Sequence, residues 1–216
     1  MLSWEQIDTV LLDMDGTLLD LHFDNYFWRE HLPLKWGEKH DIELDEARNQ
    51  LTPRFEKIFG TMSWYCVDYW SEELQLDIME LKNDVHHLIN VRPHTETFLQ
   101  FLKESDKHVV MVTNSHVKVL DMKMQKTGID RYFDRIYSSH SLGVIKEDRK
   151  FWETLNREFE FDPARTVLID DNVTVLRTAK RFGIRHLLSI AQPDSKSARH
   201  DTGEFMAISS FEHLIT

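Results

Sequence analysis

Short apolar runs recur along the chain, and polar residues follow each of them. The runs cover residues 9–12, 108–112, 166–169 and 185–190. Asp13, Thr113 and Asp170 come directly after the first three runs. Continuous apolar runs of this length are typical of parallel strands that are buried on both faces. The pattern therefore predicts four such strands, three of which end in groups that can do chemistry.

Helical patterns lie between these runs, and the clearest covers Asn172 to Phe182. Its apolar residues recur at helical spacing, Asn172 is a candidate N-cap, and Gly183 is a candidate stop. Strand and helix in repeated alternation predict an α/β fold with a doubly wound, Rossmann-like parallel sheet. In such sheets ligands bind at the carboxyl ends of the strands, where the polar residues after the first three runs would lie.

One long segment breaks this alternation. Between Leu21 and Val91 no strand-like run occurs, whereas helical patterns cover residues 24–31, 45–59 and 63–74. We therefore expect a helical cap at residues 21–91, inserted into a core made of residues 1–20 and 92–216.

The expected cap is rich in aromatic residues: 11 of the chain's 24 lie between residues 21 and 70. A small helical domain needs such bulk for its own core, which is the simplest interpretation. Alternatively, one or two rings line a substrate pocket and stack on a planar base. Candidates for that role are Tyr26, Phe27 and Trp28, with Asn25 or Arg29 bonding the edge of the base.

Composition and charge narrow the classes of function. Of 216 residues, 41% are hydrophobic, and 26 basic against 37 acidic residues give a formal net charge of −11. Such a chain repels a nucleic-acid backbone unless it has a local basic patch, and we find no such patch in the sequence. Neither a signal-type segment nor an apolar run long enough to span a membrane occurs, so we expect a cytoplasmic protein without membrane or nucleic-acid partners.

Cysteine and histidine usage gives no sign of a soft-metal site. Cys66 is the sole cysteine, so it cannot form an internal disulfide or a Cys-based zinc cluster, which fits a reducing compartment. The histidines show no metal-ligand spacing, and we expect most of them on the surface. His116 is the histidine expected near the site, because it follows Thr113 closely.

The strongest chemical signal is the sequence VLLDMDGT at residues 10–17. An apolar run ends in Asp13 and Asp15, and a turn at Gly16 would let both carboxylates reach one ligand. An acidic turn after a strand is the purely structural interpretation, but it is common for a lone aspartate and rare for this whole octet.

This octet resembles the first motif of the haloacid-dehalogenase-like (HAD) hydrolases, and matches to the other three motifs follow in order. These are Thr113-Asn114 after the second run, Lys146 within the sequence IKED, and Asp170-Asp171 after the third run. Two positions depart from the usual pattern, with Ile145 in place of proline and Ser115 in place of alanine. The resemblance covers residues 10–190.

The resemblance implies a role for each matched residue. Asp13 would attack phosphorus and form an aspartyl-phosphate, while Asp15 would act as general acid and base. Mg²⁺ would be bound by Asp13, the main chain of Asp15 and Asp171, with Asp170 as a further ligand or as support behind them. The phosphoryl oxygens would be bound by Thr113 and the backbone at Asn114, and Lys146 would hold Asp13 and offset negative charge.

The segments LDMDGTLLDL, FDNYFW, WYC and DYW also resemble the bacterial GMP/IMP nucleotidases. That resemblance implies hydrolysis of a small phosphomonoester, a purine 5'-mononucleotide. The alternatives are a sugar-phosphate or phosphoglycolate-type phosphatase, a phosphomutase, or a non-catalytic binding protein. A dehalogenase of the same fold is disfavoured, because it would need neither Asp15 nor the Asp170-Asp171 pair.

Overall fold

A computed structural model describes residues 2–215, and within them six parallel strands form one sheet in the order β3-β2-β1-β4-β5-β6. The strands are β1 (Thr9–Leu12), β2 (His108–Thr113), β3 (Arg135–Ser138), β4 (Thr166–Ile169), β5 (His186–Ile190) and β6 (Met206–Ile208). The doubly wound, Rossmann-like α/β fold is therefore confirmed.

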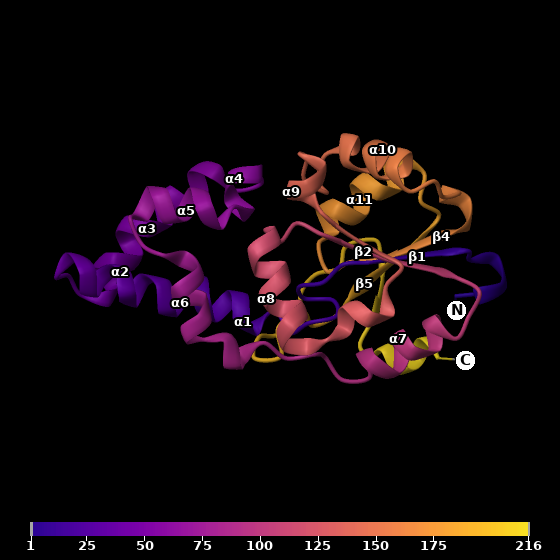
Figure 1. The fold of residues 1–216 in the computed structure, drawn as a ribbon, viewed down its shortest axis with the longest axis horizontal. Helices are drawn as coiled ribbons and strands as arrows, with labels where there is room; N and C mark the ends of the chain where they lie inside the picture. Colours follow the sequence, from indigo (N-terminus) through magenta and orange to yellow (C-terminus); the bar gives the residue numbers. More distant parts are fainter. Residues whose placement is uncertain (1, 216) are drawn as a thin grey trace.

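Helices cover both faces of the sheet (Figure 1). They are α7 (Thr95–Lys103), α8 (Val117–Thr127), α9 (Ser139–Leu142), α10 (Arg149–Glu158) and α11 (Val173–Phe182). Along β1, Val10 and Leu12 pack into one apolar cluster with α7 and α8, whereas Leu11 packs into a second cluster with α10 and α11. Burial on both faces explains why the central strands are apolar without interruption.

The four predicted strands are present, but β3 and β6 were not predicted. Both lie at the edges of the sheet. In β3 three of four residues are only partly buried or exposed, and two of the three residues of β6 are exposed. An edge strand that faces solvent carries little apolar pattern, so the sequence signal was weak. The prediction for α11 is confirmed, including its cap: Asn172 Oδ1 accepts from Thr174 N at 2.9 Å.

The segment between β1 and α7 is helical, as expected, and lies to one side of the sheet (Figure 1). Its helices are α1 (His22–Tyr26), the π-helix η2 (Phe27–His31), α2 (Leu32–His40), α3 (Leu44–Ile58), α4 (Met62–Tyr65), α5 (Val67–Leu74) and α6 (Ile78–Asp84). Short 3₁₀ turns complete the described chain at Trp4–Gln6, His86–Leu88, Ile129–Tyr132, Pro163–Arg165 and Phe211–Leu214.

Two predicted helices in this segment have different bounds. The first runs on from α1 through η2 into α2, and it ends where Asp41 adopts a left-handed conformation at φ 54°. The expected helix at residues 63–74 is broken at Cys66, whose backbone is extended. Cys66 caps α5 instead, because its Sγ accepts a hydrogen bond from Tyr69 N at 3.4 Å.

The chain crosses between the sheet and this helical segment twice, and the two crossings pair with each other. Leu19 and Val91 form an antiparallel bridge, with hydrogen bonds from Asp20 N to Asn90 O at 2.9 Å and from Arg92 N to Leu18 O at 3.0 Å. We therefore propose to keep the division into a core of residues 1–20 and 92–216 and a cap of residues 21–91.

Most cap aromatics pack against one another. Trp70 is fully buried and makes edge contacts with Trp28, Phe55 and Trp64. The interpretation that the aromatic residues build the cap's own core therefore holds for this cluster. Among the described residues, no helix is both long enough and apolar enough to span a bilayer.

We predict that Phe98→Ala destabilises the fold much more than Phe59→Ala. Phe98 is fully buried in α7 and stacks on Phe211 at 4.8 Å, whereas Phe59 is 71% exposed. Truncation of a buried phenylalanine costs about 3–5 kcal/mol of unfolding free energy, and the exposed one should cost less than about 1 kcal/mol. Urea denaturation followed by circular dichroism measures both. Equal losses would contradict the assignment of Phe98 to the core.

Candidate active site

The parallel register brings the sequence motifs to one edge of the sheet. Leu12 pairs with Met111 of β2 and with Ile169 of β4. Consequently Asp13, Thr113 and Asp170, which lie just beyond these pairs, emerge side by side at the carboxyl ends of three adjacent strands. This is the edge at which doubly wound sheets bind ligands.

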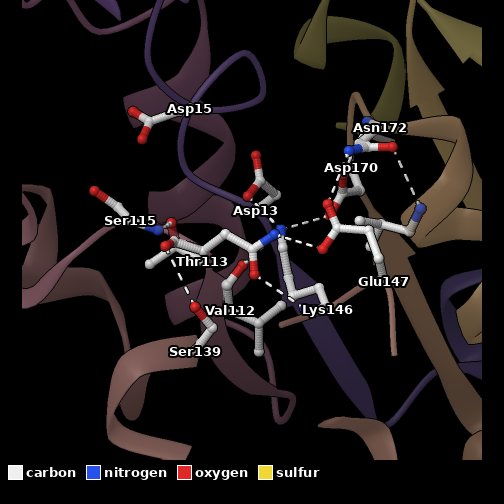
Figure 2. Close-up of polar contacts among 12 residues, drawn as sticks. Asp13, Asp15, Val112, Thr113, Ser115, Ser139, Lys146, Glu147, Asp170 and Asn172 are labelled. Carbon is white, nitrogen blue, oxygen red and sulfur yellow. Dashed lines mark hydrogen bonds and ion pairs between the residues drawn. The ribbon is translucent and has the colours of Figure 1, made fainter. Parts of the chain in front are cut away.

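Lys146 joins all three of these strand ends through its ammonium group (Figure 2). Its Nζ donates to Asp13 Oδ1 at 2.5 Å, to Asp170 Oδ2 at 2.7 Å and to the Val112 carbonyl at 3.2 Å. Lys146, Asp13 and Asp170 are all buried. Burial raises the pKa of Asp13 to about 6 although Lys146 opposes the shift, whereas the two carboxylates outweigh burial and raise the pKa of Lys146.

The backbone of Lys146 is fixed as firmly as its side chain. Its N–H donates to Asn114 Oδ1 at 3.0 Å, and its carbonyl accepts from the indole of Trp152 at 2.9 Å. Asn114 also donates to Glu147 at 2.8 Å. The side chain of Asn114 therefore connects the second and third motifs, and this contact was not predicted.

Three carboxylates at this edge fit a divalent cation. One oxygen each from Asp13, Asp170 and Asp171 lies within 4.8 Å of the others. Among residues 2–215, the buried Asp13 Oδ2 has no hydrogen-bond partner. Burial, followed by repulsion from Asp13 and Asp170, raises the pKa of Asp171 well above its usual value. A hard cation with oxygen ligands would satisfy the free oxygen and relieve this repulsion.

Of the neighbouring Asp170 and Asp171, it is Asp170 whose two carboxylate oxygens both accept hydrogen bonds from the protein. Its Oδ2 accepts from Lys146, and its Oδ1 accepts from Asn172 N at 2.9 Å. Both aspartates line the cavity between the sheet edge and the cap, and the carboxylate of Asp171 lies beside Gly16. The φ of Gly16 is +82°, and a Cβ at this position would lie 2.5 Å from Asp171 Oδ2. The predicted turn at Gly16 is thus present, and only glycine leaves room for the carboxylate.

Asp15 lies apart from the Lys146 cluster (Figure 2). Its Oδ1 accepts from Lys123 Nζ of α8 at 2.6 Å, and the same ammonium donates to Asp24 of the cap at 2.6 Å. Lys82, also from the cap, donates to the other oxygen of Asp24 at 2.9 Å. A chain of alternating charges, with both lysines buried and both aspartates partly exposed, therefore connects Asp15 with the cap. Sequence analysis missed Lys123, Asp24 and Lys82.

The pKa shifts along this chain follow from its charges. Burial raises the pKa of Asp15 to about 6 against the opposing effect of Lys123. Burial also disfavours ionised Asp24, but Lys123 and Lys82 outweigh it and hold the pKa of Asp24 below its usual value. Asp15 is therefore a carboxyl group that can exchange a proton near neutral pH, whereas Asp24 stays ionised.

A cavity of about 450 Å³ lies between the sheet edge and the cap. The sheet side contributes all the residues singled out from the sequence motifs: Asp13, Asp15, Thr113, Asn114, Lys146, Asp170 and Asp171. Its cap side includes Asn25, Trp28, Trp64 and Tyr65.

The cap residues suggested as base contacts divide into two groups. Asn25 and Trp28 do line the cavity, and Asn25 Nδ2 also donates to Asp194 at 2.7 Å. In contrast, Tyr26 and Arg29 are exposed, and Phe27 is buried in the apolar core. The latter three were therefore wrong candidates.

Comparison with known proteins supports these observations. The family model of haloacid dehalogenase-like hydrolases matches residues 7–183. The chain is 38% identical over 214 residues to the GMP/IMP nucleotidase YrfG of Escherichia coli K12, covering 99% of this chain and 96% of that protein. The YrfG of Shigella flexneri gives the same values.

A solved structure resembles this fold over nearly its whole length. The crystal structure of a HAD phosphatase from Thermococcus onnurineus superposes with a TM-score of 0.79 at 23% identity, covering 96% of both chains. With its four motifs gathered at one cavity and its full-length similarity to a nucleotidase, the chain belongs to the haloacid dehalogenase-like hydrolases and is a phosphoric monoester hydrolase.

Proposed function

We propose that this hydrolase is a Mg²⁺-dependent 5'-nucleotidase that converts GMP and IMP to nucleoside and phosphate. The observation that carries the proposal is the convergence of Asp13, Asp171 and Lys146 on one cavity. The similarity to YrfG over nearly the whole chain supports the choice of purine nucleotides, because it extends through the cap.

The first half of the reaction transfers the phosphoryl group to the protein. Asp13 lines the cavity and attacks phosphorus, so that an Asp13–phosphate bond forms while the ester P–O bond breaks. Asp15 donates its proton to the departing alkoxide, a role that its raised pKa favours. Thr113 and the backbone amides after β2 bind the phosphoryl oxygens.

The second half returns the enzyme to its starting state. Asp15 takes a proton from water as the water attacks phosphorus, and the bond from phosphorus to Asp13 breaks to release phosphate. Lys146 stays beside Asp13 throughout and offsets the charge of the phosphoryl group. Asp13, the main chain of Asp15 and Asp171 would hold Mg²⁺, with Asp170 behind them. The ion, when bound, neutralises charge on the phosphoryl oxygens.

The cavity also suggests how the base is bound. Trp28 and Trp64 lie nearly parallel, with ring centroids 6.1 Å apart and an interplanar angle of 23°. Both line the cavity together with Tyr65. Aromatic rings that line the cavity suit a planar purine, whereas phosphoglycolate has no ring to stack on them.

The central test is phosphate release from a panel of nucleotides, sugar phosphates and phosphoglycolate. We expect GMP and IMP to be the best substrates, and we expect chelation of Mg²⁺ to abolish turnover. Asp13→Asn should lower kcat at least about 10³-fold, because it removes the nucleophile. Asp106→Asn, the same change at an exposed site, is the matched control. Better turnover of sugar phosphates would contradict the substrate proposal while leaving the phosphatase intact.

We predict that Asp171→Asn raises the Mg²⁺ concentration needed for half-maximal activity at least about 10-fold, because it weakens a direct ligand. The melting temperature of the metal-free variant should not fall, because the substitution removes repulsion from Asp13 and Asp170. Metal titration of phosphate release and thermal denaturation measure the two effects. An unchanged Mg²⁺ requirement would show that Asp171 is not a ligand.

We predict that Lys123→Met lowers kcat about 10²-fold, the lower end of what a general acid-base group supplies, because Asp15 loses its anchor. The KM should change little, because Lys123 is not among the residues lining the cavity. Lys126→Met, at an exposed position of the same helix, is the matched control. Steady-state kinetics would contradict the positioning role if kcat stayed at the wild-type value.

A further inference from the structure

A second group of ligand-type side chains lies where the cap meets the core, separate from the aspartates. Cys66 comes from the cap, at the break between α4 and α5. His116 is the N-cap of α8, and His140 lies in α9, so both belong to the core. One potential ligand atom from each of the three lies within 4.8 Å of the others.

His140 is the unusual member of this group. Within residues 2–215, neither of its ring nitrogens has a hydrogen-bond partner, although both are buried. Burial, followed by the neighbouring His116, lowers the pKa of His140 to about 4. Two buried nitrogens without partners are costly unless a ligand satisfies one of them.

His116 is oriented toward the same place. Its Nδ1 accepts a long hydrogen bond from Lys118 N at 3.4 Å, so coordination through Nε2 moves the ring proton to Nδ1 and breaks this bond. The ring of His116 contacts that of His140 edge-on at 4.6 Å between centroids. Asp68 Oδ2 lies 3.8 Å from His116 Nε2 and brings a negative charge to the group.

We propose that Cys66, His116 and His140 form a binding site for a borderline transition-metal ion of the Zn²⁺ type. One thiolate and two imidazoles suit such ions and disfavour Mg²⁺, which prefers oxygen. Ligand distances of about 2.0–2.3 Å place the two nitrogens and one sulfur of a tetrahedral ion about 3.3–3.6 Å apart, so the three groups need to close by at most about 1.5 Å. The fourth position is open to water or Asp68.

The position of the site determines what the ion does. Cys66 belongs to the cap and both histidines to the core, so a bound ion joins the two parts. Other contacts follow the same seam, namely Lys118 with Asp68 at 2.6 Å and Tyr65 with Glu147 at 2.6 Å. The ion therefore holds the cap against the core beside the cavity. If the proposed nucleotidase function is correct, the bound ion also slows turnover, because it keeps the cap closed over the product.

The test is metal binding to the full-length protein, which does not depend on the proposed function. Zn²⁺ is titrated calorimetrically in the presence of reductant and saturating Mg²⁺, so that the aspartate site is occupied. We expect one Zn²⁺ per chain. Cys66→Ser and His140→Gln should each weaken binding by more than the roughly 10–100-fold that loss of an outer-shell partner costs. Co²⁺ in place of Zn²⁺ should show a thiolate charge-transfer band that Cys66→Ser removes.

Two controls separate this site from other Zn²⁺ binding. His87→Gln, at an exposed histidine, and Asp171→Asn, at the aspartate site, should both retain the ion. Binding that Asp171→Asn abolishes and Cys66→Ser leaves intact would overturn the proposal, as would the absence of a Zn²⁺ site in the wild type. If Zn²⁺ binds as expected but no phosphomonoester is hydrolysed, the metal site stands and the proposed nucleotidase function falls.

Discussion

The site depends on one buried ammonium group. Several carboxylates emerge at the same sheet edge, and without a cation they would repel one another in a region of low polarity. The Lys146 ammonium binds Asp13 and Asp170 at 2.5 and 2.7 Å, and its backbone is fixed by Asn114 and Trp152. Removing one partner of such a buried ion pair costs about 3–5 kcal/mol, because the other charge is left uncompensated. The position of Asp13, the proposed nucleophile, is thus determined by the core of the fold.

A second ammonium group, that of Lys123, holds two carboxylates together in the same way on the side of the cap. Lys123 is shared between Asp15 and Asp24 as Lys146 is shared between Asp13 and Asp170. One aspartate of each pair belongs to the sequence DMD, and the other comes from elsewhere in the chain. The two lysines hold Asp13 and Asp15 separately, so that the two carboxylates, for which we propose different roles, do not share one ammonium group. Because Lys123 also donates to Asp24 of the cap, the position of Asp15 depends on the cap.

The sequence predicted the parts of the molecule that leave a local pattern. The central strands are apolar because both faces are buried, and the motif residues follow them directly, so both could be identified. The edge strands β3 and β6 leave no such pattern. Contacts between distant residues leave none either, as with Lys123 and Asp24, which lie 99 positions apart. The same holds for Cys66, His116 and His140, because a metal-ligand spacing is visible only when the ligands are neighbours in sequence.

The paired crossings at Leu19 and Val91 limit how the cap can move. The loop after β1 is closed on itself by bonds from Gly16 N to Leu19 O and from Leu19 N to Met14 O, both at 2.9 Å. The loop that carries Asp15 and the first crossing therefore form one hydrogen-bonded unit, and the second crossing is bonded to it. Because the two crossings are hydrogen-bonded to each other, the cap bends about them as one hinge and not about two independent connections. Any opening of the cap is thus mechanically coupled to the loop that carries Asp15, so substrate entry would also move the proposed proton donor.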